Sequence, residues 1–162
     1  MKYIYRILLI AAFVLASCST PKVTYDRHTD FSRYHNFAYI KKDLLDAPLY
    51  PQIKKIIATE VHRTLLQKNL TPSRQPDLLV RIIPSVHKRV DVYIRRDMFG
   101  LDKTKYESHE GTITVELIDF RNKKTVWRTT FYINFNSNSS LKKVLDKKLS
   151  QAFAHFPPEV SK

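Results

Sequence analysis

Six histidines are the side chains best suited to bind a metal ion or to transfer a proton. They do not recur at the short interval that lets two imidazoles reach one ion, and the single cysteine, Cys18, lies near the N-terminus. We therefore expect no metal site and no bound cofactor. The histidines are His28, His35, His62, His87, His109 and His155.

Acid–base catalysis needs a histidine and a carboxylate held together, and the tightest such group in the sequence is His109-Glu110 beside Glu107. These residues lead into a predicted strand, where neighbours point to opposite faces and need not converge on one substrate. The two glycines, Gly100 and Gly111, are too few for a Rossmann fingerprint or a Walker loop. No serine stands in a nucleophile elbow. We expect no catalytic residue.

The surroundings of Cys18 indicate a different chemistry. A basic segment with Lys2 and Arg6 is followed by nine apolar residues, Ile7–Leu15, and then by Ala16-Ser17-Cys18. This is the pattern of a secretory signal peptide, and the apolar run is much shorter than the roughly 20 residues of a membrane-spanning helix. Leu15-Ala16-Ser17-Cys18 resembles a bacterial lipobox, in which the cysteine thiol receives a diacylglyceryl group.

We expect residues 1–17 to be removed and lipidated Cys18 to anchor the protein, because two acyl chains hold a protein durably on a membrane. An ordinary signal peptide with a stray cysteine and a buried N-terminal helix are the alternatives. Ser19 after the anchor, with no aspartate, is typical of lipoproteins that diderm bacteria send to the outer membrane. The expected location is the cell envelope, on the outer membrane and facing the periplasm.

The chain is strongly basic, with 28 Lys and Arg against 15 Asp and Glu and a net charge of +13. Loss of Lys2 and Arg6 with the leader removes two positive charges and leaves +11. On the last predicted helix four lysines fall off the stripe of Leu141, Leu145 and Leu149, and we expect an exposed basic face there. It could contact anionic lipid, lipopolysaccharide or an envelope protein, or merely keep the helix solvated. The four are Lys142, Lys143, Lys147 and Lys148.

Nucleic-acid binding would need the same excess of positive charge. Tyr93, Phe99 and Tyr106 near Arg95-Arg96 could stack on bases. Export keeps the protein away from that partner, so we expect no nucleic acid.

Two amphipathic helices are predicted. From Pro51 to Lys68, apolar residues recur at the spacing of one helical face, and Asn69 and Pro72 end the pattern. A second helix follows the polar linker 136–140 and stops at Pro157. Its apolar positions are Leu141, Val144, Leu145, Leu149, Ala152, Phe153 and Phe156.

Short β-branched and aromatic runs predict the strands. Trp127 alternates in phase with Phe131 and Ile133, so we expect it on the buried face of the sheet. Residues Arg95–Tyr106 have mixed charge and no clear period, and we expect them to form a loop that could be mobile. The predicted strands are Val23–Tyr25, Asn36–Ile40, Leu78–Ile83, Val86–Ile94 and the two sides of a hairpin whose turn is Asp119–Lys124.

The order of these elements predicts an α+β fold, an antiparallel β-sheet with two amphipathic helices packed on one face. One domain is expected at residues 23–158, after a lipidated tether at 18–22 and before a tail at 159–162. A domain of this size buries enough surface to need no disulfide.

Several segments of the mature chain resemble the envelope-lipoprotein family known as domain of unknown function 4136. They are Asp30–Tyr39, Pro76–Val80, the stretch from Glu110 through Asp119 to Arg128, and Phe156-Pro157-Pro158. Thr129 stands where that family usually has glycine, and Tyr39 where tryptophan is common. The resemblance implies a membrane-tethered α+β module of unknown activity and supplies no site residues.

These observations together predict a membrane-anchored envelope lipoprotein with a non-catalytic binding or structural role. The competing expectation is an envelope hydrolase or transferase that acts on glycan or lipid. The lack of a convergent acid–base pair in the sequence argues against this second class.

Overall fold

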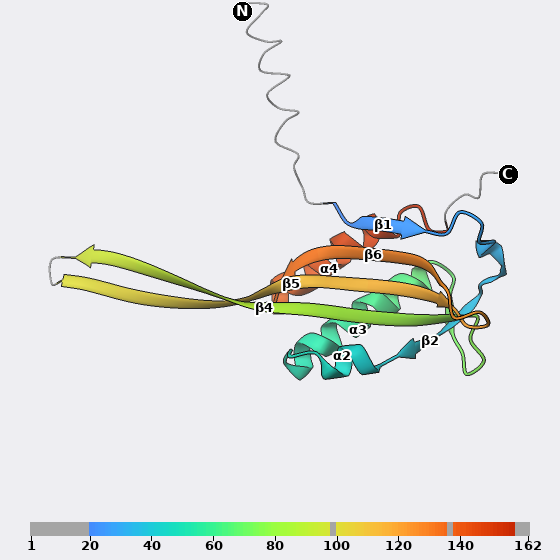
Figure 1. Cartoon of the computed structure of the whole chain (residues 1–162), viewed down its shortest axis with the longest axis horizontal. Helices are drawn as coiled ribbons and strands as arrows, with labels where there is room; N and C mark the ends of the chain where they lie inside the picture. The colour runs from blue at the N-terminus through green and yellow to red at the C-terminus, as the bar shows by residue number, and fades with distance from the viewer. Residues whose placement is uncertain (1–19, 98–99, 136–137, 158–162) are drawn as a thin grey trace, which may run out of the picture.

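The computed structural model describes residues 20–97, 100–135 and 138–157. A six-stranded sheet has the order β1-β6-β5-β4-β2-β3, and helices α3 and α4 pack beside each other against one of its faces (Figure 1). The predicted α+β class is confirmed. The strands are β1 Lys22–Tyr25, β2 Asn36–Ile40, β3 Thr71–Pro72, β4 Leu78–Asp97, β5 Gly100–Asp119 and β6 Thr125–Asn134. The helices are η1 Phe31–Arg33, α2 Lys42–Asp46, α3 Pro51–Gln67 and α4 Asn138–Ala152.

The sheet is mixed rather than wholly antiparallel. Strands β1, β6, β5 and β4 pair antiparallel, whereas β2 runs parallel to both β4 and β3, with Phe37 opposite Leu78. The expectation of an antiparallel sheet is therefore wrong at the β2 edge. The cause is the connection, because the chain leaves β2, passes through α2 and α3, and returns to β4 in the original direction.

Helix α3 is this crossover, and it begins and ends within one residue of the predicted bounds. Pro51 occupies its first turn, where a missing N–H has no helical partner to lose. Asn69 takes a positive φ of 61° just beyond the helix, and the N–H of Leu70 donates to the carbonyl of Leu65 at 3.1 Å, which ends the helix. The apolar side chains that α3 buries are Ile53, Ile57, Val61 and Leu65.

The core lies between the sheet and the helix pair, and Trp127 is at its centre. The Trp127 side chain is 1% exposed, as its alternation in β6 predicts, and its ring centroid lies 4.2 Å from that of Phe153. Phe156 closes the same cluster at 5.7 Å from Trp127. These contacts bind the C-terminal segment after α4 to the sheet.

Strands β4 and β5 form a hairpin that is much longer than the sequence predicts. They pair without interruption from Leu78 opposite Asp119 to Asp97 opposite Gly100, and the outer half projects from the domain as a two-stranded arm (Figure 1). The expectation of a loop at Arg95–Tyr106 is wrong, because Arg95–Asp97 belong to β4 and Gly100–Tyr106 to β5, while residues 98–99 lie outside the described ranges. Their mixed charge has no period along one strand, and the backbone pairing of the two strands, with Arg95 opposite Asp102, is not visible in the sequence.

Gly111 marks the place where the arm leaves the sheet. A Cβ atom at this position would lie 1.8 Å from the carbonyl oxygen of Ser85 on β4. The backbones of β4 and β5 therefore approach closely here, at a point that only glycine permits. Beyond it the arm has no helix beneath it (Figure 1).

Candidate functional site

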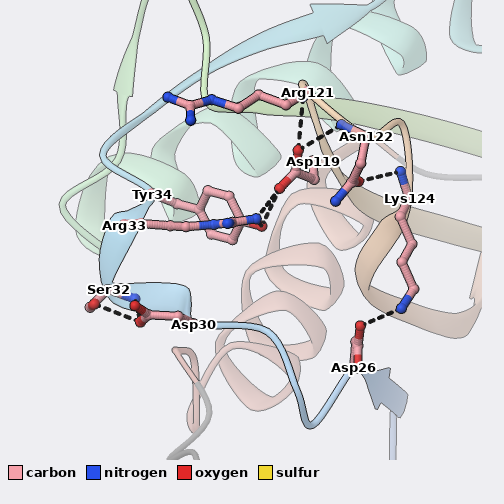
Figure 2. Close-up of polar contacts among 9 residues, drawn as sticks. All are labelled: Asp26, Asp30, Ser32, Arg33, Tyr34, Asp119, Arg121, Asn122 and Lys124. Atoms are coloured by element: carbon pink, nitrogen blue, oxygen red, sulfur yellow. Dashed lines mark hydrogen bonds and ion pairs between the residues drawn. The ribbon is translucent and has the colours of Figure 1, made fainter.

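The carboxylate of Asp119, at the end of β5, joins several parts of the chain (Figure 2). Its Oδ1 accepts the backbone N–H groups of Arg121 at 2.8 Å and Asn122 at 3.1 Å, which shapes the β5–β6 turn. Its Oδ2 accepts the hydroxyl of Tyr34 at 2.8 Å and a guanidinium N–H of Arg33. The Asp119 side chain is only 2% exposed. One buried carboxylate thus accepts hydrogen bonds from two backbone amides of the turn, a phenol and a guanidinium group.

The short helix η1 positions Arg33 and Tyr34 for this contact. Asp30 caps it, because the Asp30 Oδ1 accepts the backbone N–H of Ser32 at 3.0 Å and its hydroxyl at 2.6 Å (Figure 2). The buried ring of Phe31 packs edge-on against Tyr34 at 6.0 Å between centroids. A polar cap and an apolar anchor therefore fix the segment that carries both partners of Asp119.

Asp77, just before β4, links the same end of the sheet to β2. Its Oδ2 accepts the backbone N–H of His35 at 3.0 Å and that of Asn36 at 3.3 Å, while Asn36 Oδ1 accepts the Asp77 N–H at 2.8 Å. The N–H of Phe120 donates to the Asp77 carbonyl at 2.9 Å. Three segments, at residues 30–36, 77 and 119–122, are therefore joined by hydrogen bonds.

A further ion pair connects this turn to the first strand. Lys124 Nζ donates to Asp26 Oδ2 at 2.6 Å (Figure 2). This hydrogen bond, with the backbone N–H of His28, lowers the pKa of the Asp26 carboxyl to about 2. The contact ties the end of β1 to the β5–β6 turn.

The protonation states in the cluster follow from these contacts. Burial acts to raise the pKa of the Asp119 carboxyl, but hydrogen bonds from Tyr34 and two backbone N–H groups, together with the Arg33 charge, outweigh it and hold that pKa below its usual value. Burial raises the pKa of the Tyr34 phenol. Asp119 is therefore a weak base and Tyr34 a weak acid. Both states suit a structural cluster better than proton transfer.

A hollow of about 90 Å³ opens beside this cluster and is lined by Arg33, Tyr34, Asp77, Asp119 and Arg121. The Arg121 side chain extends away from the Asp119 carboxylate, although its backbone N–H donates to it (Figure 2). The volume suits a few water molecules or a small ion and is well below the roughly 300 Å³ at which ligand pockets begin.

A second polar network lies on the sheet face that α3 and α4 leave open. Arg81 Nε and Nη2 donate to the two carboxylate oxygens of Asp43 at 2.9 and 3.0 Å. Arg128 Nε donates to Glu116 Oε1 at 2.7 Å, and Arg81 Nη1 lies 3.8 Å from Glu116 Oε2. The Glu116 side chain is 6% exposed. These charges bridge α2, β4, β5 and β6 and neutralise one another.

The basic face predicted for the last helix is only partly present. Lys142, Lys143 and Lys147 are exposed, but Lys148 is buried at 7% exposure, so its assignment to that face is wrong. Position 148 lies seven residues after Leu141 and three after Leu145, which places it on the buried stripe. Val144, expected on the apolar stripe, is instead 37% exposed. The helix ends at Ala152, and Phe153 and Phe156 enter the core from the segment after it.

The other predicted sites can be placed only in part. Cys18 lies outside the described residues, and β1 begins at Lys22. His109 and Glu110 are consecutive in β5, and the Tyr132 hydroxyl donates to the Glu110 carboxylate. Over the ranges that the structure describes, no three His, Cys, Asp or Glu residues are grouped so as to hold a metal ion. Within those ranges no helix is long and apolar enough to cross a membrane.

Sequence reasoning did not identify the cluster of Arg33, Tyr34, Asp77 and Asp119. Arg33 and Tyr34 are adjacent, but they lie 86 and 85 positions from Asp119, and no recognisable motif links them to Asp77 or Asp119. The one available signal was the family resemblance, because three of the segments that carry it, Asp30–Tyr39, Pro76–Val80 and Glu110–Arg128, meet at this cluster.

The sheet, the helix pair on one face and the arm define a small α+β domain whose polar cluster holds its turns together. The chain belongs to the family described as Domain of unknown function (DUF4136), whose model matches residues 21–158. This confirms the resemblance found in the sequence. A comparison with the curated proteins gives no match.

Solved structures of similar fold come from distant relatives. A PDZ domain protein from Parabacteroides distasonis has 14% identity and a TM-score of 0.55, with 93% of this chain and 40% of that one covered. This chain thus spans two fifths of that protein's length. PelC from Paraburkholderia phytofirmans, described as a dodecamer, has 13% identity and a TM-score of 0.52, with 83% of this chain and 96% of that one covered. At such identities the likeness shows the fold alone.

Proposed function

We propose that the protein is a lipid-anchored module of the bacterial cell envelope, on the outer membrane, whose domain acts by binding or scaffolding rather than by catalysis. The state of the Asp119 cluster carries the second half of this proposal. Its carboxylate is ionised, buried and hydrogen-bonded to four donors, so it has no proton to give and little tendency to accept one. An envelope hydrolase or transferase would need, in this hollow, a group whose pKa is closer to the working pH.

The short tether supports a position close to the membrane. Cys18 is separated from Lys22, the first residue of β1, by only three residues. Four residue steps span at most about 14 Å when fully extended. Lipidation at Cys18 would therefore hold the β1 edge of the sheet within that distance of the lipid headgroups.

The exposed lysines of α4 are compatible with the same orientation. Helix α4 contacts β6, which pairs with β1, so α4 lies toward the anchored edge of the sheet (Figure 1). Lys143 and Lys147 are exposed there, and Lys142 Nζ lies 4.0 Å from Glu60 Oε1 while its side chain stays 70% exposed. Each cation close to an anionic surface contributes about 1 kcal/mol before screening. We therefore propose these three lysines as an auxiliary contact with anionic lipid or lipopolysaccharide.

A scaffolding role agrees with one structure of similar fold. PelC is described as a dodecamer. The fold is therefore compatible with assembly, and an envelope domain without catalysis can act by assembling or by holding another component.

The anchor is tested by replacing Cys18 with alanine in the full-length chain, with Ser19→Ala as the matched control. The control should incorporate a radiolabelled fatty acid and remain with the membranes after a high-salt wash. Cys18→Ala should lose the label and leave the membrane fraction, because the diacylglyceryl group has no other thiol to attach to. Retention of Cys18→Ala on washed membranes would contradict lipid anchoring.

A further inference from the structure

The arm formed by β4 and β5 leaves strand edges without a partner in the described chain. Strand β2 pairs with β4 only as far as Arg81, and β6 pairs with β5 only from Glu110 onward. Between Arg89 and Asp97 the described ladder joins β4 to β5 alone. This ribbon is about 30 Å long, and a two-stranded ribbon is at best marginally stable in water. A third strand on a free edge would stabilise it.

We propose that the arm pairs with the arm of a second copy of this chain, through the outer edges of the two β4 strands. In antiparallel pairing about a two-fold axis normal to the sheet, one central residue lies opposite the same residue of the other copy. A residue that precedes the centre by a given number of positions then lies opposite the residue that follows the centre by the same number. The sequence of β4 favours Tyr93 as this centre. The opposed residues are then Asp91 with Arg95, Arg89 with Asp97, and Val92 with Ile94.

Charge complementarity favours this register over the neighbouring centres from Asp91 to Arg95. Each of its two pairs of opposite charge occurs twice by symmetry, and directly opposed opposite charges stabilise a sheet while like charges destabilise it. A centre at Val92 would oppose Arg89 to Arg95, and a centre at Ile94 would oppose Asp91 to Asp97. Centres at Asp91 or Arg95 would oppose each of these charges to itself. Among these five neighbouring registers, only the one at Tyr93 places no like charges opposite each other.

The geometry of the domain accommodates this pairing. The new ladder between the two copies would cover Arg89–Asp97 of β4. Strand β6 pairs with β5 only from Glu110, which lies opposite His87 of β4, so the whole ladder would lie outside the three-stranded part of the sheet. The tip of each arm would reach Lys88 of the other copy and stop short of its body. The two bodies would lie at opposite ends of a four-stranded band. The match of β4 to itself, rather than to an unspecified surface, identifies the partner as a second copy, and it does not depend on the lipid anchor.

Disulfide trapping tests the register directly. Full-length Tyr93→Cys in envelope membranes, oxidised with copper phenanthroline, should give a disulfide dimer, because opposed Cα atoms in antiparallel strands lie about 4.5–5.5 Å apart. Tyr106→Cys is the matched control. It lies on β5 opposite Asp91, so two copies would be at least three strand spacings, about 14 Å, apart and should not crosslink. The parent chain controls for crosslinking through Cys18.

A dimer of twice the chain mass with Tyr93→Cys and none with Tyr106→Cys would support the proposal. No dimer with Tyr93→Cys, equal dimers with both variants, or a product of another mass would overturn it.

Charge reversal gives an independent measurement in detergent-solubilised protein. Asp91→Arg and Arg95→Asp, made singly, should each weaken dimerisation by roughly 10-fold, because each change creates two like-charge pairs in place of two favourable ones. The double variant should recover dimerisation, since opposite charges face each other again. Analytical ultracentrifugation measures all three. A double variant that dimerises no better than the single variants would overturn the proposed register.

Discussion

Replacing Asp119 with alanine leaves four hydrogen-bond donors without their shared acceptor. The resulting loss in the free energy of unfolding can be estimated from the structure. The Tyr34 hydroxyl is buried beside Asp119, so losing its acceptor costs about 1–3 kcal/mol. The N–H groups of Arg121 and Asn122 lie in an exposed turn, where water can replace the carboxylate, so they add about 1 kcal/mol together. Arg33 is 50% exposed, and its ion pair adds no more than about 1 kcal/mol. We expect Asp119→Ala to lower the free energy of unfolding by about 2–5 kcal/mol.

Urea unfolding of the domain from Thr20 onward, followed by the fluorescence of buried Trp127, measures this loss. Tyr34→Phe removes one of the four hydrogen bonds and should cost about 1 kcal/mol. Asp119→Asn keeps one acceptor oxygen and should fall between these two variants. An Asp119→Ala variant that loses less than about 1 kcal/mol would refute the structural role of the cluster and make the hollow a candidate binding site.

The pH dependence gives a second check on Asp119. Its folded-state pKa is below the usual value, so the unfolded chain binds protons more readily in acid and the carboxylate stabilises the folded domain. This contribution is fully present above the unfolded pKa of about 3.9 and is lost as the pH falls through the lower folded pKa. The stability difference between the parent domain and Asp119→Asn should therefore be constant from pH 5 to 7 and shrink below about pH 4. A difference that grows on acidification would contradict the assignment.

Two further predictions concern the core and the basic face. Trp127→Ala should cost roughly 3–5 kcal/mol in urea unfolding, because it leaves a cavity against Phe153, and native emission that is red-shifted and quenched by iodide would contradict the burial of Trp127. Changing Lys142, Lys143 and Lys147 together to glutamine should abolish low-salt binding of the domain to anionic vesicles without lowering its stability. Exposed Lys41, Lys42 and Lys55, changed in the same way, serve as the control, and equal binding by the two triple variants would exclude a role for α4.

The strongly periodic elements of this fold could be predicted from the sequence alone. Helix α3, strand β2, the β5–β6 turn and the burial of Trp127 all follow from apolar spacing and turn residues within short windows. Spacing of this kind is a local property, because one face of a helix or strand must be covered whatever covers it. The family resemblance rests likewise on short segments, and the match over residues 21–158 confirms it.

Tertiary structure decided the features that depend on which elements meet. The direction of β2 depends on the crossover through α3, and the charged residues of the arm form a strand only because β4 and β5 pair across it. Lys148 is a case in which two local signals disagree. Helical spacing places it on the apolar stripe, whereas its charge suggests exposure to solvent. An aliphatic stem can be buried although the residue is charged, so residue type alone misplaced it.

The Asp119 cluster shows the limit of sequence reasoning most clearly. Arg33 and Tyr34 lie 86 and 85 positions from Asp119, and each looks like an ordinary polar residue in its own segment. Their hydrogen bonds form only when η1 and the β5–β6 turn reach the same end of the sheet. The pKa of a carboxylate is set by its solvation and by neighbouring charges in space, and no local pattern in the sequence encodes either.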